Sequence, residues 1–69
     1  MVNKALLRYE MAKKGIAVEQ MAKILGISRS AFWKKCNGVS EFRQYEIKKM
    51  IEVLQPEDPV AIFFADEVS

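Results

Sequence analysis

Residues 16–38 read IAVEQMAKILGISRSAFWKKCNG. Met21 and Leu25 are four residues apart, which places both on one buried face of a short helix. Gly26 follows where that helix must end, because glycine adopts a left-handed backbone conformation without a steric penalty. Ser28 is then a good N-cap for the next helix. The stretch therefore predicts two short helices joined by a three-residue turn.

The second of these helices has two different faces. Phe32 and Cys36 are four residues apart and share the inner face. Arg29, Trp33 and Lys34 belong to the opposite, largely basic and polar face. A helix of this kind, presented by a tight turn that contains glycine, is typical of a helix-turn-helix unit that reads DNA.

Three further helices are predicted outside this stretch. Asn3 is a good N-cap for the first, and Pro56 and Pro59 break the chain before a short last turn. No stretch of alternating apolar and polar residues indicates a sheet. We therefore expect an all-α fold, a compact bundle of about five helices in a single domain of 69 residues. The expected helices cover about residues 4–14, 18–25, 29–36, 44–54 and 59–65.

Charge is divided unevenly along the chain. Residues 1–49 hold all eleven Lys and Arg and four acids, a net charge of +7, whereas residues 50–69 hold five acids and no base, a net charge of −5. A basic body with an acidic C-terminal segment, residues 55–69, suits a polyanionic partner on one face only. Lysines scattered over solvated faces would give the same count, so charge alone does not decide between the two interpretations.

Composition argues against several other classes of protein. The single Cys36 cannot close an internal disulfide, which fits a reducing compartment. Because His is absent, we expect neither a zinc site nor a Cys–His nucleophile pair, and hence no enzyme, no metal, no cofactor and no small-molecule ligand. No apolar run approaches twenty residues and no charged-then-apolar leader is present, so we expect no membrane span and no signal peptide.

Residues 7–54 resemble the Cro/cI-type, or lambda-repressor-like, helix-turn-helix regulators of the XRE family. The resemblance is closest to small phage-encoded or prophage Cro-like proteins, through the runs GISRS and NGVSEF. It implies a lambda-repressor-like DNA-binding domain with its helix-turn-helix over about residues 17–37. The signature consists of five residues at fixed intervals, namely Ala22, Gly26, Ile27, Asn37 and Gly38.

The chain departs from this family at three positions. Ala17 stands where a Thr or Ser cap is usual, and Val18 replaces a Gln that commonly binds the DNA backbone. Lys35 occupies a position that is usually apolar, and we expect Cys36 to supply the inward contact in its place.

The resemblance implies a sequence-specific transcriptional regulator of double-stranded DNA, a phage or prophage Cro-like repressor in the cytoplasm of a bacterial host. The second helix of the motif would enter the major groove, and a homodimer would occupy two half-sites of a near-palindromic operator. Two alternatives from other classes remain. One is a protein-interaction module on the same fold, an antirepressor or co-regulator, and the other is an excisionase-like architectural protein that bends DNA.

The expected DNA contacts lie on the outer face of the second motif helix and at the start of the helix that follows. Arg29 is placed for a bidentate contact to guanine, and Lys34 for a phosphate or a guanine. Arg43 is a poor N-cap, which is explained if a phosphate lies close by; a pair with Glu41 or Glu46 is the alternative. The expected DNA-binding residues are Ser28, Arg29, Ser30, Trp33, Lys34, Asn37 and Arg43.

Some of these residues also have a structural interpretation. Ser30 can be ordinary surface, Trp33 can pack over a neighbour as partial core, and Asn37 can be a plain turn residue before Gly38.

Near the C-terminus, Ile62, Phe63 and Phe64 form an apolar cluster. The cluster is expected to cover the core of the small bundle. The alternative is a dimer interface, with residues 65–68 extended against a partner chain.

Overall fold

The computed structural model describes residues 1–67, which form five α-helices and a short 3-10 helix and contain no strand. The expected all-α class is therefore confirmed. The four longer helices end within one residue of the limits predicted from the sequence. The elements are α1 (Lys4–Lys13), α2 (Val18–Leu25), α3 (Arg29–Cys36), α4 (Gln44–Leu54), α5 (Pro59–Phe63) and the 3-10 helix η1 (Ala65–Glu67).

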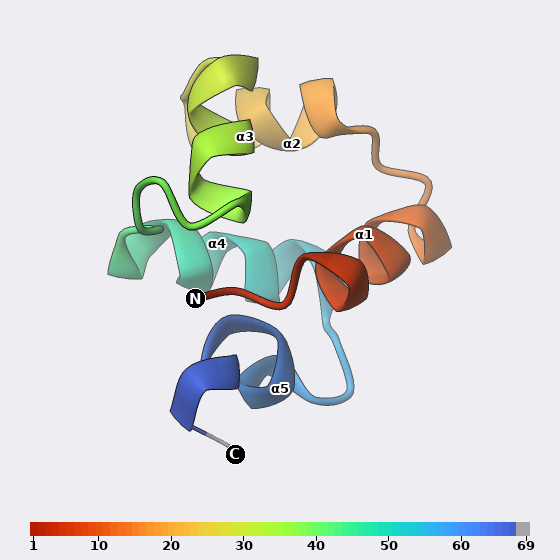
Figure 1. The fold of residues 1–69 in the computed structure, drawn as a ribbon. Helices are drawn as coiled ribbons and strands as arrows, with labels where there is room; N and C mark the ends of the chain where they lie inside the picture. The colour runs from red at the N-terminus through yellow and green to blue at the C-terminus, as the bar shows by residue number, and fades with distance from the viewer. Residues whose placement is uncertain (68–69) are drawn as a thin grey trace.

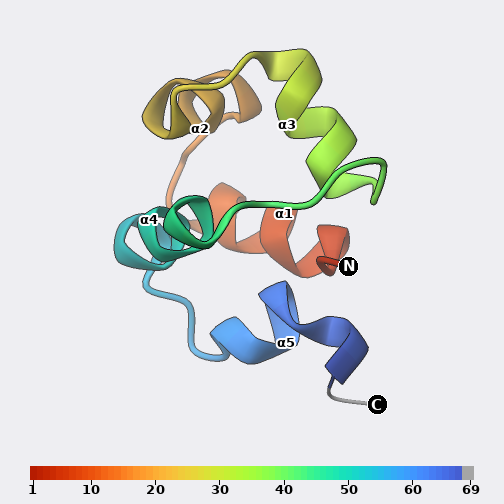
Figure 2. The same ribbon diagram turned by 90° about the vertical axis from the view of Figure 1, so that its left-hand side faces the viewer.

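The helices lie in three tiers, with α2 and α3 above, α1 and α4 in the middle and α5 below, as two perpendicular views show (Figures 1 and 2). The core lies between these tiers and receives side chains from all five α-helices. Burying one large apolar side chain contributes about 1.5–3 kcal/mol, so this shared core holds the tiers together. Its fully buried apolar members are Leu7, Met11, Met21, Phe32, Met50 and Leu54.

Helices α1 and α3 begin with the side-chain caps that the sequence predicts, and α2 begins with a different hydrogen bond. Asn3 Oδ1 and Ser28 Oγ each accept a hydrogen bond from an N–H three residues on, at 3.1 and 3.0 Å. Ala17 has no side-chain oxygen, but Gln20 Oε1 accepts from its backbone N–H at 3.0 Å. The N-terminus of α2 is thus capped by Gln20, a residue of the helix itself.

The turn between α2 and α3 depends on Gly26, whose φ of +72° lies in the left-handed region. A Cβ added there would meet no atom within 4 Å, so the backbone angle, and not space, calls for glycine. Ile27 N donates to Ala22 O at 3.0 Å and its side chain packs against the core. The chain therefore reverses tightly, and α3 runs across α2 (Figure 1).

The C-terminal segment differs from the prediction in two respects. α5 ends at Phe63, two residues early, because Phe64 leaves the helical region (φ −127°, ψ 40°). Ala65–Glu67 then form a 3-10 helix, so the extended conformation considered for residues 65–68 is wrong for these three, and residue 68 lies outside the described residues. Asn3 N donates to Ile62 O at 2.7 Å, which joins the start of α1 to α5.

No helix in residues 1–67 is long and apolar enough to span a bilayer.

Cys36 on α3 is buried, and desolvation raises the pKa of its thiol from 9.0 to about 11, against smaller lowering effects of the Arg8 and Lys4 charges. The unfolded thiol ionises first as pH rises, so the stability contributed by the folded thiol is present below about pH 9 and lost toward about pH 11. We expect the wild-type free energy of unfolding to fall relative to Cys36→Ala by up to about 1.4 kcal/mol per pH unit in this window.

Urea titrations of both proteins from about pH 8 to about pH 10 measure this difference. All other ionisable side chains are common to both proteins, so the comparison isolates the thiol of Cys36. Parallel pH profiles would show that burial does not hold the proton on Cys36.

Candidate nucleic-acid interface

The inner face of α3 fixes this helix to the scaffold. Phe32 is only 1% exposed, and its ring meets the ring of Phe42 edge-on, with 5.7 Å between centroids and 67° between planes. Cys36 is buried one turn further along. Because both anchors point inward, the orientation of the opposite face is set as well.

The outer face of α3 carries side chains that form no ion pair or side-chain hydrogen bond in the part of the chain that the structure describes. Arg29, Ser30 and Lys34 are exposed, and within residues 1–67 neither of the two cations forms an ion pair. Trp33 is 60% exposed and is absent from the residues that pack against the core. The interpretation of Trp33 as part of the core is therefore wrong.

Asn37 closes the C-terminal end of α3 with both ends of its amide. Its Nδ2 donates to Trp33 O at 2.8 Å, and its Oδ1 accepts from Lys4 Nζ at 2.9 Å. The structural role expected for Asn37 as a turn residue is thus confirmed. A DNA contact from Asn37 stays a prediction, and the second N–H of its amide is the donor left for a phosphate.

Arg43 occupies the N-cap position of α4, as the sequence predicts, and its side chain is exposed. Its backbone N–H donates to Glu46 Oε1 at 2.7 Å, which makes half of a capping box. In the described part of the chain, the guanidinium forms no ion pair with Glu41 or Glu46. The carboxylate of Glu46 is instead occupied by Lys35.

A buried ion pair joins α3 to α4. Lys35 Nζ lies 2.6 and 2.8 Å from the two carboxylate oxygens of Glu46, and these side chains are 12% and 1% exposed. Every buried side-chain oxygen and nitrogen in the described residues has a partner. The pair therefore fastens the start of α4, and Arg43 with it, at a fixed place beside α3.

Sequence reasoning missed this pair, although a signal was present. Lys35 stands at a position where the resemblance implies an apolar residue, and Cys36 is buried as expected. The structure shows that the Lys35 ammonium also turns inward, toward a partner eleven residues away. An unexpected cation on an inner face is the kind of residue for which an acidic partner should be sought.

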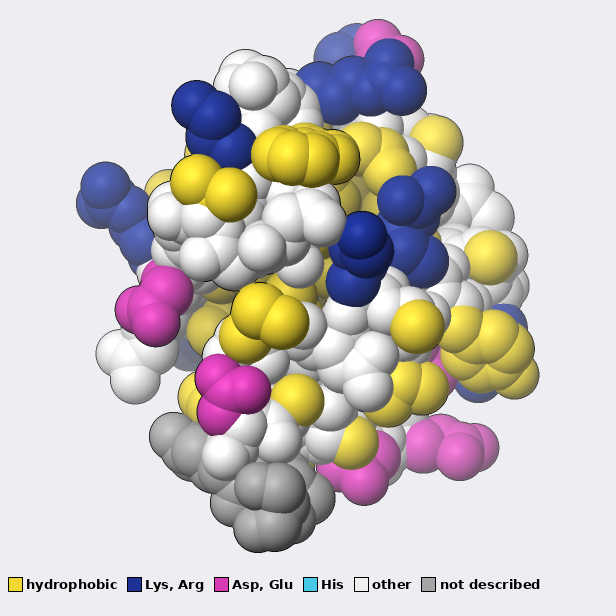
Figure 3. All heavy atoms as spheres, in the orientation of Figure 1, with side chains coloured by type: hydrophobic (Ala, Val, Ile, Leu, Met, Phe, Trp, Pro, Cys, Tyr) yellow, Lys and Arg dark blue, Asp and Glu magenta, His cyan; other side chains and the backbone are white. Residues whose placement is uncertain are grey.

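Charge is separated on the surface. In Figure 3 the dark blue side chains of Lys and Arg lie mainly over the upper half of the molecule, where α2 and α3 are found, and most of the magenta Asp and Glu side chains lie lower. The division along the sequence is thus also a division in space on this face. It favours a polyanion at the α3 end of the molecule.

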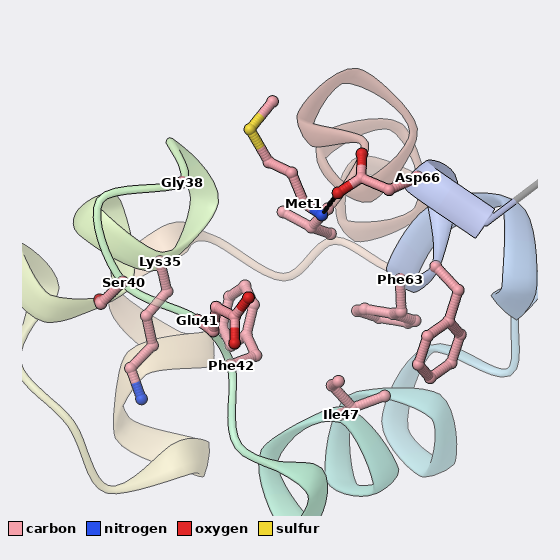
Figure 4. A pocket seen from close by; sticks show the side chains of 11 residues that line it. Met1, Lys35, Gly38, Ser40, Glu41, Phe42, Ile47, Phe63 and Asp66 are labelled. Carbon is pink, nitrogen blue, oxygen red and sulfur yellow. Dashed lines mark hydrogen bonds and ion pairs between the residues drawn. The ribbon is translucent and has the colours of Figure 1, made fainter. Parts of the chain in front are cut away.

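A pocket of about 430 Å³ lies away from the outer face of α3, between the N-terminal residues, the loop after α3 and α5 (Figure 4). Phe42, Ile47 and Phe63 contribute apolar walls, and Glu41 and Asp66 also line it. Both amines at the pocket are paired, the N-terminal amine with Asp66 and Lys35 with Glu46, so within the described residues the pocket offers no unpaired cation to a phosphate. It is better suited to an apolar group.

The three residues of the C-terminal apolar cluster have different environments. Ile62 and Phe63 belong to the core, which confirms the core-covering interpretation for these two. Phe64 is 39% exposed. A dimer interface at this cluster therefore depends on Phe64.

Comparisons with family models, with curated proteins and with solved structures found no match to this chain.

Proposed function

We propose that α2 and α3 form a helix-turn-helix of the lambda-repressor-like kind, and that the protein binds double-stranded DNA in a sequence-specific manner as a transcriptional regulator. The observation that carries this proposal is the division of α3 into a buried inner face and an exposed outer face with Arg29, Trp33 and Lys34. An α-helix with its side chains is about 10–12 Å across, which matches a major groove of about 12 Å.

In the proposed complex α3 lies in the major groove. Arg29, in its first turn, donates two hydrogen bonds to the O6 and N7 atoms of a guanine. Ser30 and Lys34 contact a base edge and a phosphate, and Trp33 lies against thymine methyls or sugars. Arg43 and the first amides of α4 hold a backbone phosphate. Ser28 and Asn37 cap the N-terminal and C-terminal ends of α3.

The protein acts in this proposal as a phage or prophage Cro-like repressor. Two copies bind half-sites about one helical turn apart, on a near-palindromic operator whose occupancy blocks polymerase. A single small domain makes few base contacts, and pairing brings the affinity toward the usual nanomolar range. Selection from a pool of random duplexes tests this directly, because it should yield one enriched, near-palindromic sequence.

Substitution of Arg29 and of Arg43 should have different effects on binding. Arg29→Ala is expected to weaken binding to the selected duplex by about 1–3 kcal/mol and to relax preference at one base pair. Arg43→Ala is expected to weaken binding to all duplexes alike and to reduce the slope of log K against log salt by about 0.9, the loss of one phosphate contact. Fluorescence anisotropy with matched and mismatched duplexes at several salt concentrations measures both effects.

Lys49→Ala is the control, because it removes an exposed cation from α4 at a distance from its start. It should leave sequence preference as in the wild type. If Arg29→Ala and Arg43→Ala both bind every duplex as well as the wild type, the DNA-binding surface has been assigned to the wrong residues.

The two other classes predict different results in the same assays. A protein-interaction module would use Trp33, Phe64 and the pocket lined by Phe63, and its complex would be insensitive to salt. An excisionase-like architectural protein would bend DNA strongly with little sequence preference. Enrichment of a single operator with a steep salt slope is expected only from the regulator.

A further inference from the structure

Lys4, at the start of α1, reaches the C-terminal end of α3. Its Nζ donates to Asn37 Oδ1 at 2.9 Å, and the same Asn37 donates to the backbone of α3. An ammonium has three N–H donors and the amide oxygen is neutral, so Lys4 keeps its charge and two donors. The bond therefore holds an unneutralised cation next to α3.

Arg8 lies on the same side of α1 as Lys4, because residues four apart are neighbours on a helix. Both cations lie close enough to Cys36 of α3 to lower the pKa of its thiol. Both are exposed, and within the described residues neither forms an ion pair. Figure 3 shows dark blue side chains where α1 approaches the lower end of α3.

The start of α4 and the N-terminal half of α1 flank the lower end of α3 in the view of Figure 1. In Figure 1 the start of α4, which carries Arg43, lies to the left of the lower end of α3, and the start of α1, with Lys4 and Arg8, lies to its right. A helix in the major groove has a phosphate backbone along each side. Cations on both sides of α3 match that geometry.

A purely structural role explains only part of this cluster. The negative end of the α3 dipole attracts a cation such as Lys4. Arg8 makes no hydrogen bond with α3 in residues 1–67, and a second unneutralised cation beside Lys4 adds repulsion. The pair fits a polyanionic partner better than it fits the free protein.

We propose that Lys4 and Arg8 form a phosphate-binding position on α1, and that they contact the DNA strand on the side of α3 opposite Arg43. This inference rests on the proposed function, since it adds a second backbone contact to the same complex. The contact contributes affinity and orientation without sequence information, because phosphates are the same at every base pair.

Salt titration of three variants tests the proposal, with the selected duplex and a random duplex of equal length as probes. Lys4→Ala/Arg8→Ala should lower the slope of log K against log salt by about 0.9 for each cation lost, on both duplexes. Lys4→Arg/Arg8→Lys keeps both charges and should restore most of the slope. The matched control Lys48→Ala/Lys49→Ala removes the same net charge from exposed positions of α4 that form no ion pair in the described residues, and it should stay close to wild type.

Arg8→Ala alone guards against an effect of folding, because Arg8 makes no hydrogen bond through its side chain in the described residues. It should lower the slope by about 0.9 while thermal unfolding is unchanged. A double variant with the same slope as the matched control would overturn this proposal and leave the proposed function standing. A wild type without salt-dependent binding would overturn both.

Discussion

Lys35→Met is expected to lower the free energy of unfolding by about 3–5 kcal/mol, because it leaves the buried carboxylate of Glu46 without its counter-charge. After the change only the Arg43 N–H would still donate to that carboxylate. A domain of this length has a total stability of roughly 3–10 kcal/mol. The expected loss is therefore a large fraction of the total stability, and urea or thermal denaturation followed by circular dichroism measures it.

Two further variants separate the buried charge from simple loss of contacts. Lys34→Met is the matched control, because Lys34 precedes Lys35 but is exposed, and it should change stability by about 0.5 kcal/mol or less. Lys35→Met/Glu46→Gln removes both charges and keeps an oxygen for the Arg43 N–H, so it should recover more than half of the loss. If the double variant is no more stable than Lys35→Met, the unpaired carboxylate is not the cause.

Phe32→Ala should have an effect of similar size for a different reason. Phe32 is 1% exposed and fills the space between α3 and the Phe42 ring, so truncation removes its buried area and leaves a cavity. Changes of this kind typically destabilise by about 3–5 kcal/mol. Chemical denaturation measures the loss, and DNA binding at a temperature where the variant is still folded reports whether α3 keeps its orientation.

Trp33→Ala is the matched control for Phe32→Ala, since it removes the next aromatic side chain along α3, which is 60% exposed. It should change stability by about 0.5 kcal/mol or less and should weaken binding to DNA. The opposite order, with Trp33 important for stability and Phe32 dispensable, would contradict the assignment of the inner and outer faces of α3.

Local features of the fold were predictable because they are encoded within a few residues. Asn3 and Ser28 cap the helices that follow them, and Gly26 takes the left-handed conformation that ends α2. Each of these features depends on chain geometry that is local in sequence. The outer face of α3 was predictable for the same reason, because Phe32 and Cys36 fix which side faces inward.

Contacts between distant segments could not be derived in this way. The Lys35–Glu46 pair joins residues eleven apart on two helices, and Lys4 reaches Asn37 across thirty-three positions. A pattern in sequence gives the face on which a side chain lies but not the element packed against it. The end of α5 was missed because a segment of five residues is set by its packing more than by its propensity.

The separation of α3 into a buried face and an exposed face affects how the DNA specificity of such a protein can evolve. Its anchoring side chains and its solvent-facing side chains occupy different positions, and the second group contributes little to cohesion. Under the proposed function, the outward positions can be substituted without disturbing the core. Replacing Arg29, Ser30 and Lys34 with the corresponding residues of a regulator that recognises another operator should change the DNA sequence bound, at a nearly constant melting temperature. The DNA sequence that is recognised can then change at the exposed positions, while the buried positions of α3 keep the fold.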